Sequence, residues 1–388
     1  MGPETAIIAG AEQPRQGRIS RASAVGMSVS SACGVRDHAI LLAGAMGQPA
    51  SSLHWLQRTV GTARTSRSEV LAWTRELPDA VASDDPDALI LHYSVFAYSY
   101  RGVPIFVGPT LAALGASRRP LVVVLHEFAH PWAGFGWRGK IWAATHRAVL
   151  LELLRRSTAV VATTDPRAAW LSSCPWLPRR PVAVAPVFSN LPAPEHRAPA
   201  ARDHELIGLF GYGYDGAAVE LMVEAVRRVA ARGANVRLAL FGVAGRSASV
   251  AEACLAAARS QGIESLLSVA GFLPAQTLSN ALAACVVLLF PDRYGPTSRK
   301  GTLAAAIASG TPVLALEGPG AWPELVQAGA VGLAPPDPDL LADAISALLA
   351  DVPGRDALAM RGRAFAERRM SPATSAKTIT SLLGDLIR

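Results

Sequence analysis

The feature that most constrains the fold of this chain is the alternation of short apolar runs with longer stretches rich in Ala and Leu. The apolar runs are almost wholly hydrophobic, which is typical of parallel strands covered by helices on both faces. They predict strands at residues 5–9, 38–42, 89–92, 121–126, 159–162, 181–185, 206–210, 236–241, 267–269, 286–290 and 313–316. The stretches between them predict helices at residues 20–33, 104–116, 138–156, 216–232, 248–261, 275–284, 298–309, 321–329 and 339–350. The chain is therefore predicted to be an α/β protein.

A segment rich in Pro, Ala and charged residues divides the strands into two series. This segment, residues 190–203, has no periodic apolar face and is typical of a connection between domains. A chain of 388 residues is also too long for one ordinary core. We predict two doubly wound Rossmann-like domains at residues 1–190 and 204–365, with a linker at 191–203. Ligands of such sheets bind beyond the carboxyl ends of the strands, so the cleft between the domains is the expected site.

Composition narrows the classes of protein that the chain can belong to. Hydrophobic residues make up 51% and charged residues 17% of the chain, which excludes a disordered protein. No apolar run approaches the ~20 residues that cross a bilayer, and the first residues lack a signal-peptide pattern, so we expect a cytoplasmic protein. The net charge of +7 favours an anionic partner. No nucleic-acid-binding module is recognisable, and the four widely spaced cysteines are expected to be reduced thiols.

A glycine motif follows the first strand of the second domain. Gly211, Gly213 and Gly216 form a G-x-G-x-x-G pattern between an apolar strand and a helix, where backbone N–H groups can approach a phosphate. A dinucleotide site also needs an acidic residue at the end of the next strand, but that strand ends at Phe241-Gly242. We interpret the motif as a phosphate-facing loop of another kind. An NAD-dependent oxidoreductase and a tight strand–helix turn without a ligand are the alternatives.

Two adjacent cations stand where a helix is predicted to begin. Thr297 or Ser298 is the predicted cap, and Arg299, Lys300 and Thr302 then fall in the first turn. Helix stability alone favours acidic residues there, because the helix macrodipole is already positive at that end. A bound dianion would resolve the conflict, since the amide groups, the hydroxyls and both cations would share it. The alternative is that Arg299 and Lys300 point into solvent.

A histidine and a glutamate follow the most apolar run of the first domain. Sites of parallel sheets lie at the carboxyl ends of strands, so His126 is predicted to contact substrate, with a hydrogen-bonded structural histidine as the alternative. Residues 126–130 also match the H-E-x-x-H zinc string, which works only on a helix. Here His126 ends a strand and Pro131 disfavours a helical conformation at His130. We therefore predict no metal site and keep Glu127 as a lesser candidate beside His126.

Two further features carry weaker predictions. Tyr93 and Tyr98 follow another apolar strand and either line an acceptor pocket or pack the edge of the domain. The helix around residues 146–156 carries basic residues beside an apolar face. Peripheral contact of this helix with anionic lipid at the inner face of a membrane is an alternative to an ordinary solvated helix.

These features resemble the retaining glycosyltransferases of the GT-B fold, family 4 (group 1) type, over nearly the whole chain. The most specific part is Ser298-Arg-Lys-Gly-Thr-Leu-Ala-Ala-Ala-Ile-Ala-Ser-Gly-Thr-Pro-Val313, which is similar to the donor-binding helix of that family and the G-T-P-V strand after it. Residues 318–324 loosely resemble the G-G-x-x-E segment that follows. The resemblance implies an acceptor-side first domain, a second domain that binds the nucleotide sugar, and a C-terminal helix at about 366–388 that packs back on the first domain.

The resemblance also implies roles for individual residues. Gly17 would belong to the N-terminal glycine loop near the donor phosphates, and Phe272 to the loop beside the nucleotide base. His126 would lie beside the sugar, and Glu127 would orient the acceptor or His126. No cofactor is implied, because the nucleotide sugar is the substrate.

This sequence departs from the family pattern at positions that handle charge. The two usual glutamates of the donor helix are replaced by Thr297 and Ala305, and the glycine motif occupies the place of the usual Arg and Lys. We hypothesise that Arg299 and Lys300 neutralise the leaving diphosphate instead. The other predicted donor-binding residues are Gly211, Gly213, Ser298, Gly301 and Thr302.

The predicted reaction is a metal-independent transfer of a sugar from a nucleoside diphosphate to an acceptor, with retention of configuration. UDP is favoured over GDP or TDP as the donor nucleotide, and the acceptor is a small molecule, a glycan or a lipid-linked molecule. A sugar-nucleotide-binding protein without catalysis is the alternative.

Overall fold

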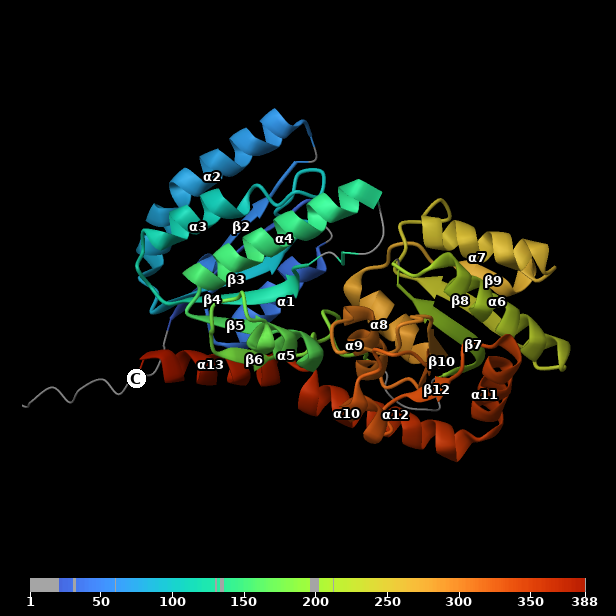
Figure 1. Ribbon diagram of the computed structural model, residues 1–388. Helices are drawn as coiled ribbons and strands as arrows, with labels where there is room; N and C mark the ends of the chain where they lie inside the picture. The colour runs from blue at the N-terminus through green and yellow to red at the C-terminus, as the bar shows by residue number, and fades with distance from the viewer. Residues whose placement is uncertain are drawn as a thin grey trace, which may run out of the picture.

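Two parallel sheets of six strands, each covered by helices on both faces, form the two domains of the protein (Figure 1). The computed structural model describes residues 21–30, 33–59, 61–129, 131–132, 136–195, 202–211 and 213–387. This is the α/β architecture of two Rossmann-like domains that the sequence predicts, and the prediction of the fold is confirmed. Within the described residues, no helix is both long enough and apolar enough to cross a bilayer.

The N-terminal domain has the sheet order β2-β1-β3-β4-β5-β6. Its elements are β1 (Ala22–Ser28), α1 (Gly34–Ala45), β2 (Leu53–Gln57), α2 (Ala63–Asp84), β3 (Ala88–Ser94), α3 (Val107–Gly115), β4 (Leu121–Glu127), α4 (Gly136–Arg156), β5 (Ala159–Ala162), α5 (Asp165–Ser173) and β6 (Val182–Val184). Helices α2, α3 and α4 pack on one face of the sheet, around a core that includes Leu91 and Leu125. The order reverses between β1 and β3, which places a topological switch point at their carboxyl ends.

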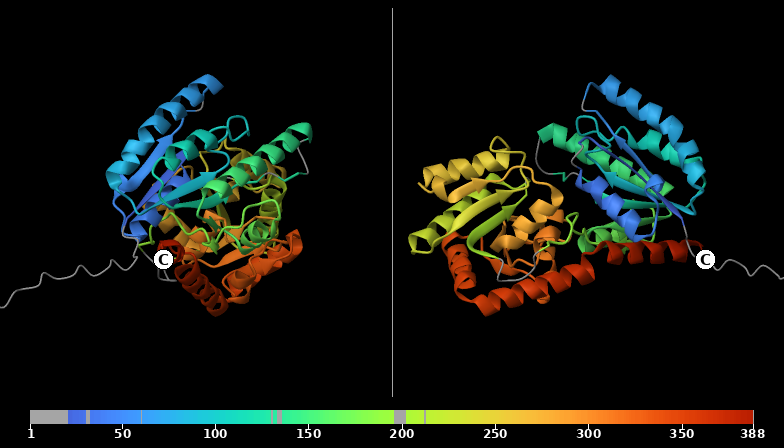
Figure 2. Two further views of the ribbon diagram at one scale, coloured as in Figure 1. Left: turned by 60° about the vertical axis from the view of Figure 1, so that its left-hand side comes forward. Right: turned by 180° about the vertical axis from the view of Figure 1, so that it is seen from behind.

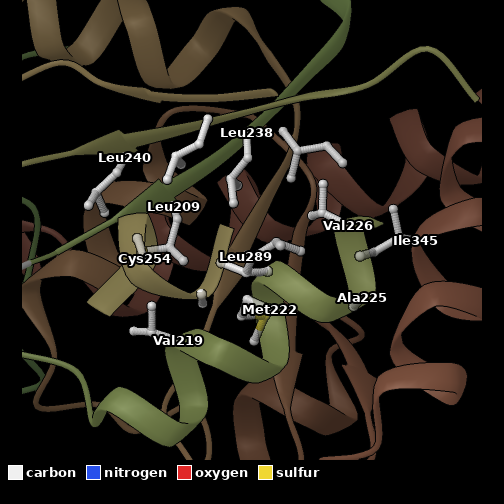
Figure 3. Close-up of a cluster of buried hydrophobic side chains, with 14 of the residues drawn as sticks. Leu209, Val219, Met222, Ala225, Val226, Leu238, Leu240, Cys254, Leu289 and Ile345 are labelled. Carbon is white, nitrogen blue, oxygen red and sulfur yellow. The ribbon is translucent and has the colours of Figure 1, made fainter. Parts of the chain in front are cut away.

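The C-terminal domain has the sheet order β12-β11-β10-β7-β8-β9. Its elements are β7 (Asp203–Phe210), α6 (Gly216–Ala231), β8 (Arg237–Phe241), α7 (Ser249–Ser260), β9 (Leu267–Val269), α8 (Ala275–Ala284), β10 (Cys285–Phe290), α9 (Gly301–Ala308), β11 (Val313–Leu316), α10 (Pro323–Gln327), β12 (Gly332–Ala334) and α11 (Pro338–Ala350). Figure 3 shows side chains of β7, β8 and β10 packed against α6, α7 and α11. The strand order reverses between β7 and β10, so the loops after these two strands lie at the switch point.

Two helices at the end of the chain join the domains. Helix α12 (Val352–Arg369) packs on α9 and β11 of the C-terminal domain, and α13 (Pro372–Ile387) packs on α1 and β6 of the N-terminal domain. Ile379 and Leu383 of α13 are buried in the core beneath the N-terminal sheet. Both views in Figure 2 show this return of the chain to the first domain. The domains are therefore connected by α13 as well as by the linker.

The first described elements correct the sequence prediction. Residues 20–33 are predicted as a helix, yet Ala22–Ser28 is the buried strand β1 between β2 and β3. Packing on both faces of the sheet outweighs the helix propensity of small residues here. Residues 38–42 are predicted as a strand but lie in α1, which buries His38, Ala39 and Leu42 at helical spacing. The predicted strand at 5–9 lies outside the described residues.

Gly26 in the middle of β1 makes room for the indole of Trp55 on β2. A Cβ atom at position 26 would lie 2.2 Å from the Trp55 ring. The indole is held there because its Nε1 donates a 3.1 Å hydrogen bond to Ser28 Oγ. The absence of a side chain at this position therefore fixes how β1 and β2 pack.

We predict that Gly26→Ala lowers the free energy of unfolding by about 1–3 kcal/mol, because the new methyl group overpacks the site. Gly44→Ala is the matched control, since a Cβ there meets no atom within 4 Å. The control is expected to be neutral or stabilising by about 0.5–1 kcal/mol, as for an Ala in a helix. Chemical denaturation of both variants measures the difference, and equal stabilities would contradict the role given to Gly26.

Candidate functional site

The loop after β10 is attached directly to the N-terminal domain. The backbone N–H of Val187 donates to Ser298 O over 2.8 Å, and Ser298 Oγ donates to Thr163 O over 2.8 Å. Arg299 Nη1 donates to Glu127 Oε1 over 2.6 Å. The loop at the switch point of the second sheet therefore meets the carboxyl ends of β4 and β5 in the first, where the sequence predicts the site.

Glu127 binds one arginine from each domain. Its Oε1 accepts from Arg299, and its Oε2 accepts from Arg167 Nη2 of α5 over 3.1 Å. Arg167 Nη1 also donates to His126 O over 2.7 Å, which fixes the end of β4. The three charged side chains are 24–36% exposed, so water screens the two ion pairs only partly. The group carries a net charge of +1, which leaves it attractive to an anion.

Helix α9 begins later than the sequence predicts. Its first residue is Gly301, and Lys300 occupies the cap position without a side-chain hydrogen bond to the helix. Thr297 and Ser298 are therefore not caps, because the contacts with the N-terminal domain hold this segment in a non-helical conformation. Ser298 is 2% exposed and its hydroxyl is used in the domain contact, which corrects its predicted role as a donor ligand.

Both predicted cations lie at the start of α9, and both are paired. Lys300 Nζ is 3.1 Å from Asp292 Oδ2, and the Lys300 side chain is 27% exposed. Arg299 is 30% exposed and reaches across to Glu127. The alternative in which these two side chains only point into solvent is thus not what the structure shows. The sequence analysis does not predict Asp292, which lies two residues after the end of β10.

The glycine motif lies beside the same helix start. Gly211 has a φ of 143°, and a Cβ at this position would lie 2.6 Å from the Tyr214 ring. The Tyr214 hydroxyl donates to Phe210 O over 2.6 Å and lies 3.4 Å from Thr302 Oγ1. Burial raises the pKa of Tyr214, so the hydroxyl stays protonated. A Cβ on Gly213 would meet no atom within 4 Å, so this side of the loop is open to a ligand.

Three buried histidines cluster beside the carboxyl end of β4, next to Glu127. His126 Nε2 is 3.1 Å from His92 Nδ1 on the neighbouring strand, and the His38 ring of α1 stands edge-on to His126 at 5.1 Å. Burial and, to a smaller extent, the positive charge of Arg167 together lower the pKa of His126 to about 4. Burial and the neighbouring histidines also hold the pKa values of His38 and His92 well below 6.5. All three rings are therefore neutral at pH 7.

The neutral His126 can exchange hydrogen bonds with a ligand but cannot act as a strong acid. The hydrogen bond to His92 supports a structural role for His126. The residue is also 9% exposed, so a ligand can reach part of it. His38 and His92 were missed from the sequence. Among the described residues, no group of three His, Cys, Asp or Glu side chains is arranged to hold a metal ion.

The remaining predicted residues lie elsewhere. Tyr93 and Tyr98 are fully buried with their rings 5.3 Å apart, so they pack the core of the N-terminal domain and do not line an acceptor pocket. For Tyr93 the cause is strand alternation, because His92 and Tyr93 point to opposite faces of the sheet. Phe272 is 67% exposed on the loop between β9 and α8. Gly17 and His130 lie outside the described residues.

Comparisons with known proteins bear on the family and the fold of this chain. Residues 205–351 match the family model described as Glycosyl transferases group 1. The fold is similar to that of HepE from Anabaena, in a structure with UDP and glucose, with a TM-score of 0.66 and 16% identity over 94% of this chain and 100% of that one. It is also similar to sucrose-phosphate synthase from Thermosynechococcus elongatus, with a TM-score of 0.63 and 17% identity over 93% of this chain and 98% of that one.

A third similar structure belongs to a different class of enzyme. A protein from Listeria monocytogenes assigned as UDP-N-acetylglucosamine 2-epimerase has a TM-score of 0.58 and 14% identity over 92% of this chain and 94% of that one. A sequence search found no match among curated proteins. The resemblance to group 1 glycosyltransferases with the GT-B fold is confirmed at the level of the family match and the fold.

The buried His126 predicts a specific dependence of stability on pH. Its pKa is about 4 in the folded chain and 6.5 in the unfolded chain, so between these values the unfolded chain binds more protons. The stabilisation is complete above pH 6.5 and is lost as the pH falls through this window. For this one group, the free energy of unfolding is expected to fall by about 2 kcal/mol between about pH 7.5 and about pH 5.

Urea unfolding at several pH values measures this loss. The slope against pH should become flatter in His126→Asn and stay unchanged in His204→Asn, whose histidine is exposed. The slope, rather than the absolute stability, is compared because removing a buried ring also leaves a cavity. Identical slopes in the wild type and His126→Asn would contradict the buried neutral state.

Proposed function

We propose that this protein is a glycosyltransferase that moves a sugar from a nucleoside diphosphate to an acceptor hydroxyl. The observation that carries the proposal is the contact of Arg299 with Glu127. Arg299 comes from the domain that matches the family model, and Glu127 follows the strand-end His126 of the other domain. A donor bound at the start of α9 would thus have its sugar close to both domains.

The charges at the site suit a departing diphosphate. Breaking the bond to the sugar leaves negative charge on the diphosphate, and stabilising such charge is usually the largest contribution to catalysis. Arg167, Arg299 and Lys300 face the carboxylates of Glu127 and Asp292, so one positive charge remains before a donor binds. A dianion would compete with both carboxylates for Arg299 and Lys300. These cations supply the charge that a metal ion would otherwise provide, and we propose that the reaction needs no metal.

Backbone groups beside these cations would complete the phosphate site. The first turn of any helix has N–H groups without partners inside the helix, which here belong to Gly301, Thr302 and Leu303. The open side of Gly213 and the tight turn at Gly211 bring a second segment of backbone close to the same place. We propose that these amides bind the phosphate oxygens while Arg299 and Lys300 neutralise their charge.

The histidine cluster would bind the sugar. His126 is neutral and its Nε2 is engaged with His92, so a sugar hydroxyl would have Nδ1 as its partner. Once a donor draws Arg299 away, Glu127 keeps Arg167 and can orient the acceptor hydroxyl. The proposed retention of configuration follows from the resemblance to the family. UDP is the proposed nucleotide, and the likeness to a structure that holds UDP and glucose supports it.

An epimerase acting on the same class of donor is a second candidate. It is favoured by the fold likeness to the Listeria protein, whereas the family match of residues 205–351 favours transfer. An epimerase converts a nucleotide sugar without any acceptor, and a glycosyltransferase releases the nucleotide faster when an acceptor is present. A non-catalytic binder would bind the donor without turnover. An NAD-dependent oxidoreductase would bind NADH, although β8 ends at Phe241 without an acidic residue.

Arg299→Gln and Lys300→Gln are each expected to weaken UDP binding by about tenfold to a hundredfold, because each removes a charged hydrogen bond to the diphosphate. Arg232→Gln, directly after α6, is the matched control, since Arg232 also pairs with a carboxylate, Asp343, at 2.8 Å. Titration calorimetry measures the affinity for UDP, GDP and TDP. Unchanged affinity in both site variants would exclude Arg299 and Lys300 from donor binding.

His126→Ala should slow sugar transfer while UDP affinity changes by less than about threefold, because the imidazole would contact the sugar and not the diphosphate. Turnover is measured as acceptor-dependent release of UDP. His204→Ala, at an exposed position of the other domain, controls for the loss of a histidine. Turnover at the wild-type rate in His126→Ala would assign this residue a structural role.

A further inference from the structure

The first turns of α4 carry large apolar side chains on the side that faces away from the protein. The helix buries Ala143, His146 and Leu150 against the rest of the domain. With 3.6 residues per turn, Trp137 and Ile141 lie together on the opposite side. Trp137 is 68% exposed and Ile141 is 44% exposed. A helix that only covers a sheet has its apolar residues on one side, so this second apolar side needs another explanation.

Neighbouring segments add further exposed apolar side chains near this helix. Trp132, just before α4, is 54% exposed. The loop between β3 and α3 is held to α4 by a hydrogen bond from Trp142 Nε1 to Arg101 O of 3.1 Å, and it exposes Phe96 and Ile105. We call Trp132, Trp137 and Ile141 the docking face.

Cations accompany the docking face, and acidic residues are missing from it. The guanidinium of Arg147 lies 4.4 Å from the centre of the Trp132 ring, and that of Arg138 lies 5.6 Å from the Trp137 ring. Between residues 88 and 151 the sequence has six Lys and Arg residues and one acidic residue. That residue is Glu127, which already binds two arginines. The two tryptophans of the docking face are therefore each accompanied by an arginine, Arg147 at Trp132 and Arg138 at Trp137.

Exposed tryptophans with arginines beside them favour a membrane surface over other partners. Tryptophan favours the headgroup level of a bilayer, where its ring is apolar and its N–H can bind water or phosphate. Arginine and lysine beside it attract anionic headgroups. We propose that the docking face binds peripherally to a bilayer that contains anionic lipids, with α4 lying along the surface.

The position of the docking face has a consequence for the acceptor. Helix α4 begins nine residues after Glu127, and Figure 1 shows its start at the end of the N-terminal domain that faces the C-terminal domain. The site would thus lie close to the lipid headgroups. This step rests on the proposed function: if the chain transfers a sugar, the acceptor hydroxyl belongs to a membrane lipid or a lipid-linked glycan.

The test is sedimentation of the full chain with vesicles of phosphatidylcholine and phosphatidylglycerol. The wild type should bind these vesicles, bind less at high salt, and bind poorly to phosphatidylcholine alone. The double variant Trp137→Glu with Ile141→Glu should bind at least about tenfold more weakly, because it replaces both apolar contacts with charges that the anionic surface repels. Arg138→Gln with Lys140→Gln should weaken binding to the anionic vesicles specifically.

A control with the same change of charge is available in the other domain. Leu340 and Met360 are 49% and 65% exposed, so Leu340→Glu with Met360→Glu adds the same two charges away from α4. This control should bind vesicles nearly as well as the wild type. Thermal unfolding checks that both double variants fold, and UDP affinity in the same variants reports on the nucleotide site separately. Loss of vesicle binding with unchanged UDP affinity would support the docking face irrespective of the proposed reaction.

Three results would overturn the proposal. The first is that the wild type does not bind anionic vesicles, and the second is that Trp137→Glu with Ile141→Glu binds them as the wild type does. The third is that light scattering shows a dimer of the wild type that dissociates in this variant, without any binding to vesicles. The docking face would then be an interface between two copies of the chain.

Discussion

The structure of the site depends on one carboxylate, Glu127, that holds an arginine from each domain. Arg167 fixes it to the end of β4 and the start of α5, while Arg299 links it to the loop before α9. Removing one partner from such a half-buried group leaves a charge that is incompletely solvated, so the pairs favour the observed arrangement of the domains. The hydrogen bonds of Ser298 with Val187 and Thr163 act in the same place. Together they determine where α9 begins and which way its free N–H groups face.

The same contacts explain how several cations can lie close together in this site. Each predicted donor cation is balanced by a carboxylate, Arg299 by Glu127 and Lys300 by Asp292. An incoming diphosphate would therefore exchange partners with groups already in position and would meet side chains that need little reordering. The histidine cluster adds no charge to the N-terminal side of the site, since burial keeps its three rings neutral and Arg167 there is paired with Glu127. The donor would thus be drawn electrostatically to the C-terminal domain.

Many of the strands and some of the site residues could be predicted from local sequence patterns. The other features depend on contacts between residues far apart in the sequence, which local patterns do not reveal. The strands at 159–162, 267–269 and 313–316 agree with the structure to the residue. β1 was mistaken for a helix since its small residues do not show that it lies inside a sheet. Arg299 was identified from its position at a helix start, but its partner Glu127 lies 172 residues earlier in the chain. His92 and Tyr93 could have been distinguished by the alternation of side chains along a strand, which assigns one to the histidine cluster and the other to the core.

The most direct test of this account is the affinity of Glu127→Gln for UDP, measured by titration calorimetry against the wild type. If Glu127 and the diphosphate compete for Arg299, removing the carboxylate charge frees the guanidinium, and UDP should bind about tenfold more tightly. Unchanged or weaker binding in a folded Glu127→Gln protein would show that Arg299 is only a structural link between the domains, and would contradict the account.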